Sequence, residues 1–332
     1  MSSGGYVAIE GWEQLPGGWA HPDVPGVAVD AEDRVYVFAR GEHPVIVYER
    51  DGTFAGSWGE GVFDNPHAIR IDHEGFVWCV DNGDHTVRKF TGAGELVLTL
   101  GEPGRASETG ARTSGADYGE FHYRQVAHGS APFHGPTDVC VLTDGSVFVA
   151  DGYGNARVHR FSADGTLEAS WGEPGRGPGQ FHIPHGLAAS PDERRLFVAD
   201  RENDRIQVFD LDGGLLDQWA GVSRPDGLAL SPDGLLCVTE LGGRAGRWPD
   251  MDPVTDATPH SVCTLLDAGT GAVVERFGTD EPCAPGSFWA AHGVAFDSAG
   301  DLYVGEVTWS AGARNGDVPA DCHTLQKLTR GV

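Results

Sequence analysis

The sequence has few basic residues and no long apolar run. Its 332 residues contain 23 Lys and Arg against 49 Asp and Glu, which gives a net charge of −26. This charge repels phosphate backbones, and no basic stripe offsets it, so we expect no nucleic-acid partner. No apolar segment approaches the roughly 18 residues that a membrane-spanning helix needs, so we expect no membrane contact either.

The chain also lacks signals for export, thiolate metal sites and dinucleotides. Its N-terminus has neither the basic segment nor the apolar core of a secretory signal, which predicts a cytoplasmic protein. The 6 cysteines include no Cys-x-x-Cys pair, which argues against a thiolate metal site. Free thiols are the default for a cytoplasmic chain. No dinucleotide-binding fingerprint is present, and helical periodicity is nowhere sustained.

One pattern of alternating apolar strands and Asp-Gly turns instead recurs six times along the chain. The copies begin near residues 25, 67, 137, 185, 226 and 292. Spacings of roughly 40 residues, with four short strands in most copies, are typical of propeller blades. The 49 Gly and 20 Pro fit such a turn-rich chain. The sequence therefore predicts an all-β, six-bladed β-propeller that forms a single domain over residues 1–332.

The sixth copy is one strand short. Its strands are expected at roughly 294–297, 302–307 and 322–328, after which the chain ends. The segment YVAIE, residues 6–10, precedes the first copy and has no local strand to pair with. Because unpaired sheet edges are liabilities, we expect residues 6–10 to complete the last blade.

Three histidines occupy the same place in the second, fourth and sixth copies: His67, His185 and His292. Alternate blades of a six-membered ring lie at roughly 120° to one another, so equivalent side chains can converge on the ring axis. Three imidazoles leave a fourth coordination position open, which is the arrangement of a catalytic zinc site. The pattern therefore predicts a metal site, most simply Zn²⁺, although another divalent transition metal would also fit.

Other candidate residues are expected at the same end of the propeller as the histidines. In an antiparallel pair the start of the first strand neighbours the end of the second, which places Arg40, Tyr153 and Arg201 there. Three long loops also emerge at this end, at roughly 102–135, 242–260 and 308–321. Long irregular loops in compact domains are often functional, although the sequence does not say whether these are lids.

The run from DGYGN at 151–155 to VADREN at 198–203 resembles peptidyl-α-hydroxyglycine α-amidating lyases, which are NHL-repeat propellers. This resemblance implies a zinc-dependent C–N lyase that cleaves a carbinolamide into an amide and glyoxylate. It implies His67, His185 and His292 as the zinc ligands. It further implies Tyr153 as the catalytic tyrosine, Arg40 as the substrate-binding arginine and Arg201 as the arginine of the VADREN motif. In the mechanism that we expect, Tyr153 is the base, and Arg40, together with Arg201, holds the substrate carboxylate.

The sequence departs from that family at three places near the expected site. Gly293 stands where the family has an aspartate that binds a structural calcium, so the resemblance does not extend to Ca²⁺. Ala290 replaces a methionine, and Gly154 replaces a cysteine inside the DGYxN motif. These changes favour the same chemistry on a different small molecule that carries a carboxylate.

Two sets of recurring residues have architectural explanations. The acids at the ends of second strands recur in five copies and are expected to cap loop amides: Asp81, Asp151, Asp200, Glu240 and Glu306. Three tryptophans recur at fourth-strand ends and are expected to pack between strands: Trp58, Trp171 and Trp219.

Two alternatives to the lyase are left open. One is a metal-dependent hydrolase like the propeller lactonases, which typically hold their metal with carboxylates and an asparagine. The other is a non-enzymatic NHL propeller that binds RNA or protein in a surface groove, against which the net charge of −26 argues. The sequence predicts neither the leaving group nor the oligomeric state.

Overall fold

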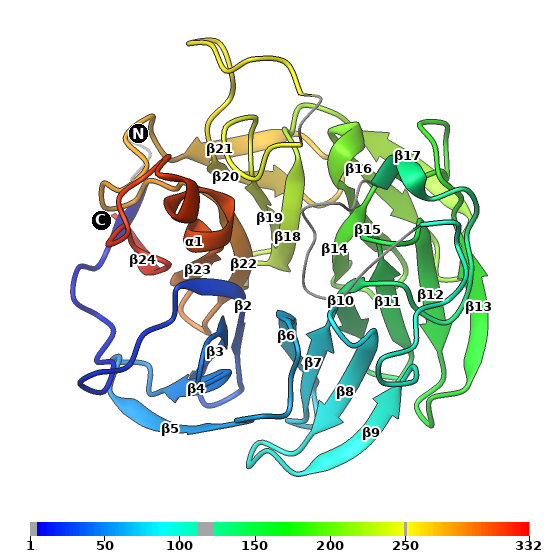
Figure 1. Cartoon of the computed structure of the whole chain (residues 1–332), viewed down its shortest axis with the longest axis horizontal. Helices are drawn as coiled ribbons and strands as arrows, with labels where there is room; N and C mark the ends of the chain where they lie inside the picture. The colour runs from blue at the N-terminus through cyan, green and yellow to red at the C-terminus, as the bar shows by residue number, and fades with distance from the viewer. Residues whose placement is uncertain (1–4, 112–122, 249–250, 332) are drawn as a thin grey trace. The chain divides into compact units, whose positions relative to one another are not determined.

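A computed structural model describes residues 5–111, 123–248 and 251–331 of the chain. Within these residues the protein is an all-β propeller of six four-stranded sheets, which confirms the predicted fold class (Figure 1). The first two strands of every sheet pair antiparallel. No helix in the described residues is long and apolar enough to cross a membrane.

The chain divides into two compact units, each with three sheets. Unit 1 comprises residues 1–57 and 221–332. Its strands are β1 (Tyr6–Ala8), β2 (Asp23–Val29), β3 (Val35–Arg40), β4 (Val45–Tyr48), β5 (Phe54–Trp58), β18 (Pro225–Leu230), β19 (Leu235–Glu240), β20 (Val262–Asp267), β21 (Val273–Phe277), β22 (Ala291–Phe296), β23 (Leu302–Glu306) and β24 (Leu325–Arg330). Within the unit, the innermost strand β22 contacts both β2 and β18.

Unit 2 comprises residues 58–220. Its strands are β6 (Pro66–Ile71), β7 (Val77–Asp81), β8 (Thr86–Phe90), β9 (Leu96–Leu100), β10 (Pro136–Val141), β11 (Val147–Asp151), β12 (Arg157–Phe161), β13 (Leu167–Trp171), β14 (Pro184–Ala189), β15 (Leu196–Asp200), β16 (Arg205–Phe209) and β17 (Leu215–Trp219). The innermost strand β10 contacts β6 and β14. The organisation of both units as one domain over residues 1–332 remains a prediction.

The N-terminal strand closes the last blade, as the sequence predicts. The sheet order is β1-β24-β23-β22, with Tyr6 opposite Arg330 and Ala8 opposite Leu328. The two ends of the chain therefore lie side by side at this sheet (Figure 1). The Tyr6 ring is buried and stacks on Phe277 of β21, with 5.1 Å between the ring centroids, so β1 also contributes to the core.

The recurring turns have a simple local cause. In the β6–β7 hairpin, the Asp72 carboxylate accepts hydrogen bonds from the backbone N–H groups of Glu74 and Phe76, both at 3.0 Å. Gly75 has a φ of 83°, a left-handed conformation that a glycine adopts without steric cost. An Asp-x-x-Gly sequence therefore specifies both the hydrogen bonds and the backbone conformation of the turn.

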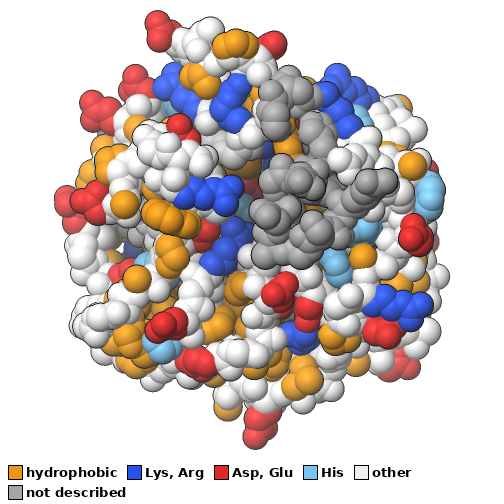
Figure 2. All heavy atoms as spheres, in the orientation of Figure 1, with side chains coloured by type: hydrophobic (Ala, Val, Ile, Leu, Met, Phe, Trp, Pro, Cys, Tyr) orange, Lys and Arg blue, Asp and Glu red, His pale blue; other side chains and the backbone are white. Residues whose placement is uncertain are grey.

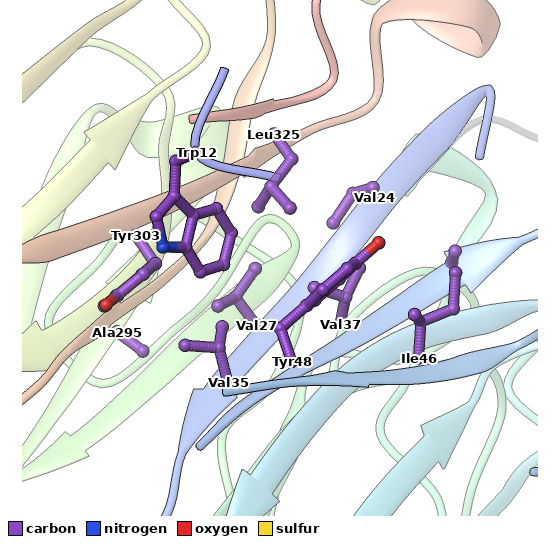
Figure 3. Close-up of a cluster of buried hydrophobic side chains, with 11 residues drawn as sticks. Trp12, Val24, Val27, Val35, Val37, Ile46, Tyr48, Ala295, Tyr303 and Leu325 are labelled. Carbon is purple, nitrogen blue, oxygen red and sulfur yellow. The ribbon is translucent and has the colours of Figure 1, made fainter. Parts of the chain in front are cut away.

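The core of unit 1 shows why the sequence alternates apolar residues in β2 to β4. Val24, Val35, Val37 and Tyr48 are fully buried and pack on one another (Figure 3). The ring of Trp12 covers this cluster from the N-terminal segment (Figure 3). Burying each such side chain contributes roughly 1.5–3 kcal/mol, which holds the first blade against its neighbour.

The cysteine expectation was wrong for one pair. Cys283 and Cys322 are joined in a disulfide, while Cys79, Cys140, Cys237 and Cys263 are free. The disulfide connects the segment before β22 to the loop between β23 and β24. Because disulfides persist mainly in oxidising compartments, this pair does not support the cytoplasmic location, which stays a prediction.

Within residues 5–111, 123–248 and 251–331, helical structure is confined to single turns in the loops. These are α1 (Thr308–Ala311) and the 3-10 turns η1 (Tyr123–Gln125), η2 (Arg201–Asn203) and η3 (Ala313–Asn315). α1 and η3 lie in the predicted 308–321 loop. Residues 112–122 of the predicted 102–135 loop, and 249–250 of the 242–260 loop, lie outside the described residues.

Candidate functional site

Each of the three predicted metal ligands is the second residue of an innermost strand. His67 lies in β6, His185 in β14 and His292 in β22. The pairing register shifts at each of these positions, between Pro66 and Ala68 in the first case. Such irregularities bend a strand and redirect a side chain. The same local geometry therefore sets the orientation of all three imidazoles, and all three are buried.

In unit 2 the structure brings His67, His185 and Tyr153 together. The ring centroids of the two histidines are 4.9 Å apart, and a ligand nitrogen of one lies within 4.8 Å of a ligand nitrogen of the other. The Tyr153 hydroxyl is 3.1 Å from His67 Nε2 and 3.3 Å from His185 Nε2. A phenol oxygen therefore lies beside the two nitrogens that are available to a metal.

The hydrogen bond of His67 fixes which nitrogen is available. Its Nδ1 is 2.6 Å from the Thr137 carbonyl oxygen, which can only accept, so Nδ1 carries the proton. Nε2 is then left with its lone pair. Metal-binding histidines usually donate their other N–H in this way, which fixes both tautomer and ring orientation.

Arg201 completes the group in unit 2. It is the first residue of η2 and is only 4% exposed. Its Nη1 lies 3.5 Å from the Tyr153 hydroxyl oxygen, and its guanidinium carbon lies 5.4 Å from the centre of the Tyr153 ring. Its Nε pairs with the Glu202 carboxylate at 3.1 Å. A positive guanidinium therefore lies next to the phenol oxygen.

In unit 1, His292 repeats the arrangement of His67. It is 5% exposed, and its Nδ1 donates to the Pro25 carbonyl oxygen at 2.7 Å. Pro25 lies in β2, the innermost strand of the next blade, just as Thr137 lies in β10. His292 thus also keeps a lone pair on Nε2, which suits it to the same role.

Arg40 lies at the end of β3, in unit 1. Its Nη1 is 3.4 Å from the Asp23 carboxylate and 3.2 Å from the Ser310 hydroxyl of α1, and its side chain is 23% exposed. The Ser310 backbone N–H also donates to Asp23, at 3.0 Å. The sequence analysis did not single out Asp23, which lies opposite Arg40 in the β2–β3 pair. It also gave no sign of Ser310, because that contact joins residues 270 positions apart.

The predicted role of the recurring acids is confirmed. Asp81 accepts from the N–H groups of Asp64 and Asn65 at 2.7 and 2.9 Å, and Asp200 accepts from His182 at 2.8 Å. Glu306 accepts from Trp289 at 2.9 Å. These carboxylates cap the loops that precede the innermost strands and are used by the fold itself.

Two departures from the lyase family have a packing reason. A Cβ at position 293 would lie 2.7 Å from the Pro25 carbonyl oxygen and 2.8 Å from the Gly26 Cα. A Cβ at position 154 would lie 2.2 Å from the His134 ring. Neither an aspartate at 293 nor a cysteine at 154 fits these backbones.

The donor set fits a transition metal. His67 and His185 in unit 2, and His292 in unit 1, each offer one imidazole nitrogen as a ligand. Neutral imidazoles are good ligands for zinc, copper, iron and nickel, whereas calcium and magnesium prefer oxygen ligands. Three nitrogen ligands also leave one coordination position for a substrate.

Comparison with known proteins supports the family resemblance. The NHL repeat model matches residues 133–161 and 181–209. A peptidyl-glycine alpha-amidating monooxygenase from Mus musculus is 33% identical over 223 residues, which cover 57% of this chain and 21% of the relative. A probable peptidyl-alpha-hydroxyglycine alpha-amidating lyase from Caenorhabditis elegans is 33% identical over 161 residues, which cover 48% of this chain and 40% of the relative.

A solved structure shows the fold over nearly the whole chain. A gluconolactonase from Xanthomonas campestris has a TM-score of 0.58 and 17% identity, and the match covers 99% of this chain and 98% of that one. The chain spans less than half the length of these two curated relatives, 21% of the mouse protein and 40% of the Caenorhabditis elegans protein. The chain is thus a six-bladed β-propeller with NHL repeats, and its sequence is similar to those of peptidyl-α-hydroxyglycine α-amidating lyases.

Proposed function

We propose that this protein is a zinc-dependent C–N lyase that cleaves an α-hydroxy-N-acyl compound into an amide and an aldehyde such as glyoxylate. His67, His185 and His292 would hold the metal, and Tyr153 would act as the base. The observation that carries this proposal is the position of the Tyr153 hydroxyl, 3.1 and 3.3 Å from the Nε2 atoms of His67 and His185. The names of the relatives point to the same reaction class.

The residues suit each step of such a cleavage. A bound metal would supply Lewis acidity, which lowers the pKa of a nearby hydroxyl group. Tyr153, in its tyrosinate form, would take the proton of the substrate hydroxyl and become a neutral phenol. The O–H electron pair then forms the carbonyl bond, the C–N bond breaks, and the amide nitrogen takes the proton back from Tyr153. No oxidant or reductant is consumed.

The two arginines have different parts in this proposal. Arg201 lies next to the Tyr153 hydroxyl and would stabilise the tyrosinate during the proton transfer. Arg40 is partly exposed and would bind the substrate carboxylate while it keeps its contact with Asp23. A planar guanidinium has enough donors for both carboxylates.

The alternative is a metal-dependent hydrolase that uses the same histidines. A hydrolase would add water across a bond, whereas a lyase releases its products without water. The likeness to a gluconolactonase concerns the fold, so the products of the reaction must decide between the two classes.

The test is product analysis with the metal-loaded protein and α-hydroxyhippurate, a small carbinolamide with a carboxylate. We expect benzamide and glyoxylate in equal amounts. A lactone such as gluconolactone serves as the hydrolase substrate in parallel. Turnover of the lactone without any cleavage of carbinolamides, at full zinc loading, would reject the lyase and favour the hydrolase.

A further inference from the structure

Unit 1 contains a cavity that has no part in the proposed reaction. Its volume is about 650 Å³, and it lies between the N-terminal segment 13–22 and the loop that carries α1. The indole rings of Trp19 and Trp309 are among its walls. Trp309 is 44% exposed, and Figure 2 shows apolar side chains exposed over the α1 segment. Neither His292 nor Arg40 lines this cavity.

Glu13 gives the cavity one unused acceptor. Its Oε1 accepts from the Tyr48 hydroxyl and lies 2.7 Å from His21 Nε2. Its Oε2 has no partner among the described residues. Glu13 is partly exposed and lines the cavity, which makes this oxygen a candidate acceptor for a ligand.

His323 gives the cavity one unused donor. Its Nε2 lies 3.0 Å from the Glu306 carboxylate and 3.0 Å from the Ser287 carbonyl oxygen. Its Nδ1 has no partner in the part of the chain that the structure describes. Burial opposes the charge on His323, but its hydrogen bond to Glu306 and the Glu306 charge outweigh burial and raise the pKa of this imidazole, which favours a proton on Nδ1.

The charges around the cavity cancel. Burial also opposes the charge on His21, yet its hydrogen bond to Glu13 and the Glu13 charge outweigh burial and raise its pKa. The walls therefore hold a His21–Glu13 pair and a His323–Glu306 pair, each without net charge. A carboxylate ligand would face Glu13, and an ammonium ligand would face two imidazolium groups. A neutral ligand avoids both the repulsion by Glu13 and the repulsion by the two imidazolium groups.

We propose that this cavity binds a neutral primary carboxamide with an aromatic or branched apolar substituent. The amide N–H donates to Glu13 Oε2, the amide oxygen accepts from His323 Nδ1, and the apolar group packs against Trp19 and Trp309. This binding site goes beyond the proposed lyase reaction, and its test does not depend on that reaction. Amides are also the products of that reaction, so the site would bind them after release.

Calorimetric titration with 3-phenylpropanamide tests the site. We expect the wild-type protein to bind the amide and to bind methyl 3-phenylpropanoate, which lacks the N–H donor, and 3-phenylpropanoate, which carries a charge, at least tenfold more weakly. Trp309→Ala should weaken amide binding by roughly five- to tenfold, because it removes an aromatic wall without touching the core.

Two further variants locate the binding. Val274→Ala removes another exposed apolar side chain, from β21, and should bind the amide as wild type does. His185→Ala should also retain binding, because the cavity does not include the proposed metal site. No binding of the amide to wild type, equal binding of all three ligands, an unaffected Trp309→Ala variant or loss of binding in His185→Ala would each overturn the proposal.

Discussion

At the scale of single residues, Tyr153 is the group with the most specific geometry. Its hydroxyl contacts two imidazole nitrogens and an arginine, and its ring lies against His67 at 5.2 Å between centroids. A tyrosine that served only to pack the blade would not need a hydroxyl at this point. Our proposal therefore assigns this hydroxyl a chemical role, as the proton acceptor of the reaction.

Replacing Tyr153 by phenylalanine should lower kcat roughly 10²–10⁴-fold, because a positioned general base contributes about that much. The KM should change little, since the aromatic ring remains. Steady-state kinetics on α-hydroxyhippurate measures both constants. Tyr6→Phe, which removes a hydroxyl that donates to the Gly300 carbonyl oxygen, is the matched control. Wild-type turnover by Tyr153→Phe would leave the reaction class standing and reject Tyr153 as its base.

Arg40 should act mainly on binding. Its proposed partner, the substrate carboxylate, is present before and after bond cleavage, so Arg40→Ala should raise KM by roughly 10- to 100-fold, the worth of a charged hydrogen bond. Lysine should rescue poorly, because it lacks the planar fork. Kinetics with the methyl ester of the substrate gives the control, since this ester should show no difference between wild type and variant. An equal loss with acid and ester would contradict the assignment.

The sequence predicted the candidate residues better than their partners. The equivalence of His67, His185 and His292 is visible because all three fall at one position of a repeat. The Thr137 and Pro25 carbonyls that orient two of these rings are backbone groups, which any residue provides, so no sequence signal marks them. The contact of Arg40 with Ser310 joins residues 270 positions apart, which no local pattern encodes.

At the scale of elements, the closure of the last blade depends on a strand of three residues. β1 pairs with β24, and the Ile9 N–H donates to the Lys327 carbonyl oxygen at 2.8 Å. Trp12, which follows β1, is buried in the core of the first blade and donates from its indole to the Arg50 carbonyl oxygen at 2.9 Å. The N-terminal segment therefore ties two blades of unit 1 together.

Deletion of residues 1–12 should lower the free energy of unfolding by at least about 3 kcal/mol, because it removes Trp12 from the core and leaves β24 unpaired. Denaturant unfolding followed by tryptophan fluorescence and circular dichroism gives this value. Deletion of residues 1–4 alone keeps β1 and is the matched truncation. A stability equal to wild type after the longer deletion would show that β1 does not close the blade in solution.

The disulfide could not be predicted from the sequence. Cys283 and Cys322 are 39 residues apart and have no recognisable spacing. Six cysteines allow many pairings, and the pair forms because β22 and β24 belong to one sheet and bring their preceding loops together. Pairing of this kind follows from the fold and becomes visible only when the fold is known.

At the scale of the whole molecule, the repeats were sufficient to predict the architecture. Six copies of one pattern gave six sheets, and the missing strand of the last copy indicated the N-terminal closure. The loops between β23 and β24 and around 242–260 were predicted only as insertions, because they do not repeat. The cavity beside the loop between β23 and β24 depends on packing against the N-terminal segment, which no other blade repeats.

If one metal ion binds to all three histidines, zinc content should depend on residues of both units. Purified protein should contain about one zinc, and His67→Ala and His185→Ala in unit 2 should lose it. His292→Ala in unit 1 should lose it as well, because one shared ion needs all three ligands. Plasma emission analysis of each variant measures the metal, and circular dichroism shows that the fold is kept. His43→Ala, which removes an imidazole stacked on Trp19, should keep its zinc.

If His292→Ala bound as much zinc as wild type while the other two variants were empty, the ion would belong to unit 2 alone. The proposal that three alternate blades share one metal would then fail, even if the lyase activity remained.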